Sequence, residues 1–157
     1  MNVIDEAKNV LRSHFDMKDL GEANFILGIK ITTTCEGIFL DQSHYVEKNL
    51  KKYNFHDCKH VATPFDSSVH LFHVESENDV INQKEYASII ESLRYVTDST
   101  RPDIAYAVGV LCRFTRMSGN QHWHAITRVM RYLIGTKNCG LFYEIYHIVL
   151  EGFCYAD

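Results

Sequence analysis

The chain has 157 residues, of which 46% are hydrophobic and two are proline, so it can bury a core and is not disordered over most of its length. Its formal net charge of −4 argues against a protein that covers nucleic acid or an anionic membrane with its whole surface. The charge is uneven, because residues 81–140 hold 8 Lys and Arg against 4 Asp and Glu, whereas both flanking segments are acidic.

The first third of the sequence predicts a helix, a β-hairpin and a second helix. Residues 3–15 place apolar side chains at three-to-four spacing, which is typical of an amphipathic helix, but no partner surface for it is obvious within the chain. Two β-prone runs at 24–33 and 37–40 are separated by a short polar link and predict a two-stranded ribbon. Apolar residues between 46 and 53 then predict a short helix.

The rest of the sequence predicts a helical region that is followed by strands. Residues 56–82 have no convincing period and contain Pro64, so we expect a long connection. Three amphipathic helices follow, over residues 86–96, 104–112 and 123–133. Residues 139–143 and 146–156 return to strand-like composition. The expected fold class is therefore α+β, with a short β-hairpin, a small helical bundle and an incomplete C-terminal β-hairpin.

The cysteines and the N-terminal sequence indicate the cellular compartment of the protein. Five cysteines stand at wide, irregular spacing, and the N-terminus lacks the apolar segment of a signal peptide. We therefore expect an intracellular protein, cytoplasmic or nuclear, and not a secreted one. No apolar run approaches the roughly 20 residues that a membrane-spanning helix needs, so no membrane partner is expected.

Several unusual segments together resemble one protein family. They are Phe-Asp-Met-Lys-Asp-Leu-Gly-Glu-Ala at 15–23, Ile-Leu-Gly-Ile-Lys-Ile at 26–31, Tyr-Val-Glu-Lys-Asn-Leu-Lys-Lys-Tyr at 45–53, Thr-Arg-Pro-Asp-Ile-Ala-Tyr-Ala-Val at 100–108 and Arg-Val-Met-Arg-Tyr-Leu-Ile-Gly-Thr-Lys at 128–137. In their order and spacing they resemble the Pol polyprotein of Ty1/copia-type retrotransposons. The resemblance runs from the C-terminal part of reverse transcriptase, through its primer grip and thumb, into the start of RNase H.

The resemblance implies a division of the chain. It assigns residues 1–22 to the end of the palm, 23–42 to a primer-grip-like hairpin, 43–138 to a thumb-like helical region with the connection at 56–82, and 139–157 to a truncated start of the RNase H domain. The primer-grip-like residues are Phe25, Leu27 and Gly28, where a glycine allows close approach of the backbone to the primer end.

Basic residues of the thumb-like region are candidates for contact with the nucleic-acid backbone. They are Arg113, Arg116, Arg128, Arg131 and Lys137. Each arginine pair is separated by three positions in a predicted helix and could straddle phosphates. The alternative is that these arginines are solvated helix-face charges. Resemblance to a thumb, which follows the sugar-phosphate backbone without reading bases, favours phosphate contact.

Catalysis is not expected of this chain by itself. The family's Tyr-x-Asp-Asp turn is absent, and in the segment that resembles the first RNase H strand Tyr155 replaces the first aspartate. Asp157 is a remnant candidate only, because a two-metal site needs several clustered carboxylates. We therefore expect no cofactor for this chain, with Mg²⁺ belonging to the parent enzyme. Glu91 and Arg94 replace a glycine and an apolar residue of the family and suggest a decayed copy.

Other clusters have structural interpretations. One alternating set could supply soft metal ligands, namely His56, Cys58 and His60, but a fourth ligand and the usual spacing are missing, so no metal site is expected. Arg101, before Pro102, suits a structural turn. His122 and His124 flank Trp123, and we expect exposed histidines around a core tryptophan.

Three functions remain open. The first is a non-catalytic fragment of a copia-type reverse transcriptase/RNase H polyprotein that helps hold a primer-template duplex in its parent. Its partners would be that duplex, bound weakly and without sequence preference, and the missing palm, fingers and RNase H parts. The second is an independent interaction protein, as in chains labelled RxLR-effector-like. The third is a piece of an active RNA-directed DNA polymerase that is separated from its catalytic half.

Overall fold

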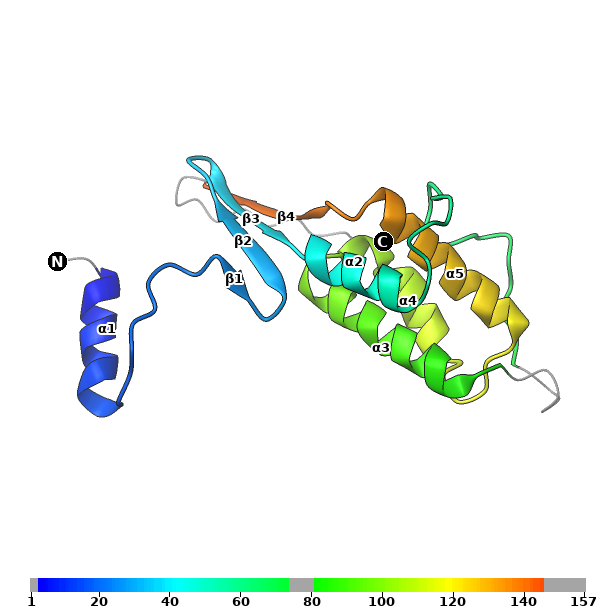
Figure 1. Cartoon of the computed structure of the whole chain (residues 1–157), viewed down its shortest axis with the longest axis horizontal. Coiled ribbons are helices and arrows are strands. Elements are labelled where there is room, and N and C mark those ends of the chain that lie inside the picture. Colours follow the sequence, from blue (N-terminus) through cyan, green and yellow to red (C-terminus); the bar gives the residue numbers. More distant parts are fainter. Residues whose placement is uncertain (1–2, 74–80, 146–157) are drawn as a thin grey trace, which may run out of the picture.

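The computed structural model describes residues 3–73 and 81–145, and these form an α+β fold (Figure 1). In chain order the elements are α1 (Val3–His14), β1 (Phe25–Ile26), β2 (Ile29–Thr33), β3 (Gly37–Asp41), α2 (Ser43–Lys52), α3 (Gln83–Ser99), the 3-10 helix η2 (Pro102–Ile104), α4 (Ala105–Cys112), α5 (Asn120–Gly135) and β4 (Gly140–Glu144). The expected fold class is confirmed. None of the helices within the described ranges is both long and apolar enough to cross a membrane.

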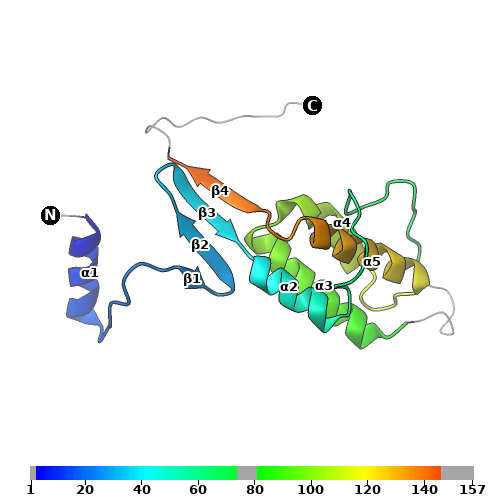
Figure 2. The same cartoon turned by 45° about the horizontal axis from the view of Figure 1, so that its top comes forward.

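The core lies within the helical bundle of α2 to α5, seen beside the sheet in Figure 2. The apolar stripes that helical periodicity predicts in α2 to α5 all supply buried side chains, because residues three and four apart share a helix face. Helix α3 contributes five buried apolar side chains: Tyr86, Ile89, Ile90, Leu93 and Val96. Val46 and Leu50 of α2 join the same cluster, which confirms the predicted short helix.

The sheet differs from the expected two-stranded ribbon. Its four antiparallel strands run in the order β1-β2-β3-β4. The β-prone run at 24–33 is divided by a turn at Leu27 and Gly28. The structure therefore has two strands, β1 and β2, where one was predicted. Residues 140–144 form β4, which pairs with β3. The second strand of the expected C-terminal hairpin, at 146–156, lies outside the described residues, as does Asp157.

Helix α1 stands apart from the bundle and is joined to the sheet by an extended segment (Figure 1). None of its residues is buried, although its sequence is amphipathic. Val3 is 78% exposed and Phe15, just beyond the helix, is 63% exposed. Lys8 of α1 forms an ion pair with Asp19 in the segment that follows, with 2.8 Å between Nζ and Oδ2. The apolar stripe of α1 is therefore exposed in the part of the chain that the structure describes.

Candidate nucleic-acid interface

The three primer-grip-like residues lie together in the β1–β2 hairpin. Ile26 pairs with Ile29 across a turn whose central residues, Leu27 and Gly28, have φ angles of 50° and 76°. Two positive φ angles are the pattern of the tight turn that suits the twist of a two-residue hairpin. Phe25 is 55% exposed and Leu27 is 81% exposed. The hairpin therefore presents apolar side chains to solvent at its turn.

Two tyrosines from the bundle support this turn. The Tyr95 hydroxyl of α3 donates a hydrogen bond to the backbone carbonyl of Leu27. Tyr45 of α2 contacts the Tyr95 ring edge to face, with 5.0 Å between ring centroids. We did not expect a role for either tyrosine from the sequence. The only sequence signal was that Tyr45 lies in the segment at 45–53 that resembles the family.

The α5 arginines bind the connection instead of standing free on a helix face. Arg128 donates from Nε to the Thr63 carbonyl at 3.2 Å and from Nη2 to Thr63 Oγ1 at 2.9 Å. Its Nη1 lies 3.3 Å from Oδ2 of Asp66. Arg131 donates from Nε to the Lys59 carbonyl at 2.7 Å. These contacts hold residues 59–66 against α5.

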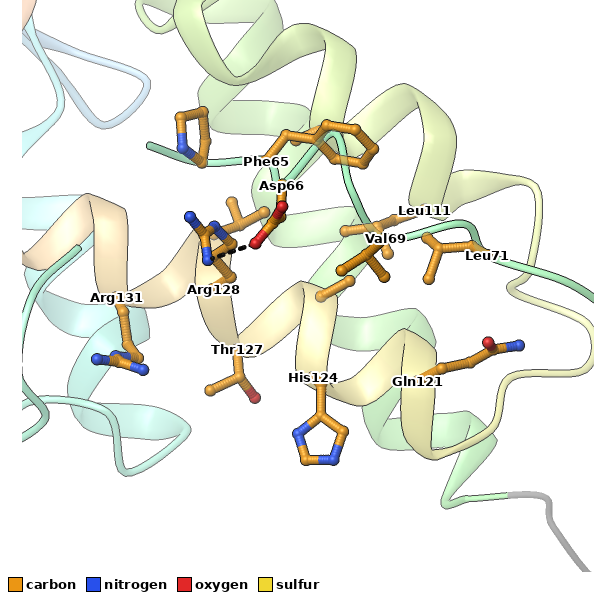
Figure 3. Close-up of a pocket in the computed structure, with 14 residues that line it drawn as sticks. Phe65, Asp66, Val69, Leu71, Leu111, Gln121, His124, Thr127, Arg128 and Arg131 are labelled. Atoms are coloured by element: carbon orange, nitrogen blue, oxygen red, sulfur yellow. Dashed lines mark ion pairs between the residues drawn. The ribbon is translucent and has the colours of Figure 1, made fainter. Parts of the chain in front are cut away.

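A cavity of about 270 Å³ lies between the connection and helices α4 and α5 (Figure 3). Its apolar lining includes Phe65, Val69, Leu71, Leu111 and Val129. The ion pair between Arg128 and Asp66 lies at the cavity, and Arg131 and His124 project near its edge (Figure 3). The connection thus covers part of the apolar surface of α4 and α5.

The other basic candidates lie outside the helices. Helix α4 ends at Cys112, so Arg113 caps it and Arg116 lies in the following turn. The prediction that these two arginines share a helix face was wrong, because the helix ends before Arg116. Lys137 lies in the turn after α5. The 16-residue helix α5 lies between Lys137 and the turn that holds Arg116. Among the described residues, no ion pair or hydrogen bond of the Arg113 or Arg116 side chain is found.

Arg101 has the structural role that was expected. It is 1% exposed, and its guanidinium bonds both carboxylate oxygens of Asp103, from Nε at 2.9 Å and from Nη2 at 2.8 Å. Its Nη1 also donates to the Thr136 carbonyl at 2.8 Å. Burial would raise the pKa of Asp103, but hydrogen bonds from Arg101 and Tyr132 outweigh it and lower that pKa. Arg101 thus joins the start of η2 to the end of α5.

The expectation for the two histidines around Trp123 was half wrong. His124 is exposed, but His122 is fully buried and Trp123 is only partly buried. Nδ1 of His122 accepts a hydrogen bond from the Gly119 backbone N–H at 3.0 Å, and its ring lies 4.2 Å from that of Phe114. The imidazole satisfies the backbone at the α5 start, which apolar periodicity did not indicate.

Metal ligation finds no support in residues 3–73 and 81–145, where no three His, Cys, Asp or Glu side chains gather as ligands would. The described cysteines are free thiols, namely Cys35, Cys58, Cys112 and Cys139.

Comparison with known proteins connects these features to a family. Residues 1–67 match the family described as reverse transcriptase (RNA-dependent DNA polymerase). Over 99% of its length the chain is 37% identical to the retrovirus-related Pol polyprotein from transposon TNT 1-94 of Nicotiana tabacum, of which it spans 12%. Over 94% of its length it is 36% identical to an uncharacterized mitochondrial protein of Arabidopsis thaliana, of which it spans 60%.

A shorter match concerns a different kind of protein. Over 36% of its length the chain is 45% identical to the secreted RxLR effector protein 161 of Plasmopara viticola, of which it spans 39%. No solved structure matches the chain. Three of the matches, which extend over 84% to 99% of the chain, are to retrovirus-related Pol polyproteins from transposons. The chain belongs to the family of retrovirus-related Pol polyproteins from copia-type transposons and corresponds to a segment of such a polyprotein.

Proposed function

We propose that this segment helps to hold a primer-template duplex in its parent Pol polyprotein and does not by itself catalyse nucleotide transfer. The main observation in favour of this proposal is the β1–β2 turn, which exposes apolar side chains. Tyr95 donates a hydrogen bond to the turn, and the Tyr45 ring packs on that of Tyr95. A narrow, supported turn with a glycine can bring its backbone close to a nucleic-acid strand. Such contact positions a duplex without reading its bases.

Basic side chains of the bundle support the same proposal. Arg113 and Arg116 are both exposed, and neither side chain has a hydrogen-bonding partner among the described residues. Each is therefore free to neutralise a phosphate. Arg128 and Arg131 contribute less, because Thr63, Asp66 and the Lys59 carbonyl already engage them.

Other parts of the parent polyprotein would supply the rest of the enzyme. The exposed apolar stripe of α1 suits packing on the remainder of the palm, whose aspartates would carry the Mg²⁺. The chain would then need no cofactor of its own and would act inside the cell, where its nucleic-acid partner is found.

Site-specific cross-linking tests the proposed contact. Leu27 is replaced by the photoreactive benzoylphenylalanine and the protein is irradiated with an RNA–DNA hybrid that carries a label at the primer end. The control places the same group at Phe72, which is 67% exposed and lies on the connection. We expect cross-links from position 27 in excess of those from position 72. Equal yields from both positions, or none from position 27, would contradict a duplex contact at the turn.

An independent interaction protein is the second candidate. Its support is the relative named as a secreted RxLR effector, and that match covers only 36% of the chain. The matches to transposon polyproteins extend over 84% to 99% of the chain and therefore favour the first proposal.

A further inference from the structure

The β1–β2 hairpin has little within itself to fix its conformation. Strand β1 has two residues, both exposed. Leu27 adopts a positive φ of 50°, a conformation that favours glycine, asparagine and aspartate over leucine. Its side chain is 81% exposed, so burial of that side chain does not compensate. The conformation of the turn must therefore be stabilised by contacts from outside the hairpin.

Helix α3 supplies the outside contact. The Tyr95 hydroxyl donates to the carbonyl of Leu27, the residue with the unfavourable φ. The Tyr45 ring lies at 69° to that of Tyr95, in the edge-to-face arrangement that aromatic pairs prefer. A Cβ at Gly28 would lie 3.7 Å from Tyr95 Oη and 3.9 Å from Tyr45 Cδ2. The turn thus rests on two rings from two different helices.

We infer that Tyr95 is a positioning residue, whose hydroxyl fixes the β1–β2 turn on the helical bundle and sets the spacing between the turn and the basic side chains of the bundle. The consequence for binding rests on the proposed function. A duplex that touches both the turn and the bundle meets them at a fixed spacing only while this hydrogen bond is intact. Loss of the hydroxyl then weakens binding although Tyr95 itself need not touch the duplex.

Hydrogen exchange of the full chain tests the positioning role. The variant Tyr95→Phe keeps the ring and removes the donor. Exchange at the amides of Ile26 and Ile29, which close the turn, should accelerate by about fivefold, the effect of one lost hydrogen bond. Exchange at Ile89 in the core should not change. The matched control is Tyr143→Phe, which changes an exposed tyrosine of β4 in the same sheet and should leave the turn unchanged.

A second substitution tests whether the hydroxyl acts through the turn conformation. Leu27→Asn places asparagine before Gly28, which is a favoured dipeptide for this turn. In the Tyr95→Phe background it should return the exchange at Ile26 and Ile29 toward the wild-type rate. Wild-type exchange at the turn in Tyr95→Phe, or failure of Leu27→Asn to restore protection, would overturn the positioning role.

Affinity for an RNA–DNA hybrid, measured on the same variants, distinguishes the positioning role of Tyr95 from the proposed duplex-holding function. We expect Tyr95→Phe to bind severalfold more weakly than wild type and Tyr143→Phe to bind equally well. If the turn exchanges faster but the wild-type chain binds no hybrid, Tyr95 fixes the turn and the proposed function is contradicted. If wild type and Tyr95→Phe bind equally well while the turn exchanges faster, the inferred link between turn position and binding is wrong.

Discussion

Arg128 of α5 forms an ion pair with Asp66 of the connection, with 3.3 Å between Nη1 and Oδ2. An arginine that the sequence assigned to phosphate contact therefore has a carboxylate beside it. The two Thr63 hydrogen bonds of the same guanidinium fix it further. Oxygen atoms of Thr63 and Asp66 thus already contact the guanidinium that a phosphate would need to reach.

Asp66 should compete with phosphate for Arg128, and removal of the Asp66 charge tests this competition. Asp66→Asn keeps an oxygen that can accept from the Ser68 backbone N–H and hydroxyl, as Asp66 does now. We expect up to about a fivefold gain in affinity for an RNA–DNA hybrid, the upper range for an exposed ion pair. Asp57→Asn makes the same charge change in the connection, at a side chain that is 90% exposed, and should have the smaller effect. Equal effects of both variants would exclude a specific competition at Arg128.

Arg101 should matter for stability and not for binding. Its guanidinium is buried and bonded to Asp103 and Thr136. Arg101→Ala should lower the free energy of unfolding by about 2 kcal/mol, because it removes the hydrogen bonds by which the buried guanidinium joins Asp103 to Thr136. The exposed Arg116→Ala should change it by less than about 0.5 kcal/mol. Urea denaturation of both variants measures the difference, and similar losses would contradict the structural role.

His122 should make stability depend on pH. Burial lowers the pKa of His122, the nearby His73 lowers it further, and a backbone hydrogen bond at Phe72 opposes the change. Since the folded-state pKa is depressed, the unfolded chain binds the proton first. Stability is therefore fully present above the unfolded pKa of about 6.5 and falls as pH drops below it, by at most about 1.4 kcal/mol per pH unit for one proton.

Comparison with a non-titrating variant isolates this histidine from the other eight in the chain. His122→Gln retains a side chain that can accept from Gly119. Unfolding free energies at pH 7.5 and pH 5.5 should differ more for wild type than for His122→Gln. A loss of the same size in both proteins would show that His122 is not responsible.

The position of the core gives another prediction. Ile89 is fully buried in α3, whereas Val10 of α1 is 57% exposed. Ile89→Ala should lower the free energy of unfolding by about 2 to 5 kcal/mol, because it removes buried methyl groups and leaves a cavity. Val10→Ala should change it by about 0.5 kcal/mol or less. A large loss from Val10→Ala in the thermal or urea transition would mean that α1 packs on the bundle.

Local sequence signals predicted the elements better than their pairing. Apolar periodicity located the helices because it reports which face of a helix is buried. The β1–β2 turn was missed because Leu27 is an unusual residue for positive φ, so only Gly28 marked it. The pairing of β4 with β3 joins segments that lie about 100 residues apart, as in Ile38 with Tyr143. No local pattern encodes such a contact.

The candidate site followed the same division. The resemblance to the family singled out Phe25, Leu27 and Gly28, which lie in one hairpin. It did not indicate the hydrogen bond from Tyr95, because that bond joins segments that are distant in the sequence. Spacing alone placed Arg113 and Arg116 on a helix, although α4 ends at Cys112. The partners of Arg128 and Arg131 could not be predicted, because the connection that supplies them has no periodic pattern.

The salt dependence of duplex binding tests the central claim most directly. The affinity of wild type for a labelled RNA–DNA hybrid is measured by fluorescence anisotropy at several salt concentrations, beside Arg113→Glu/Arg116→Glu and the control Lys48→Glu/Lys51→Glu on α2. Arg128 and Arg131 are left intact, because reversing them would also release the connection. We predict weak binding with a log–log slope on the order of −2 to −4, and a shallower slope for the arginine variant only. No binding, a salt-independent signal, or equal slopes for the two variants would contradict the account.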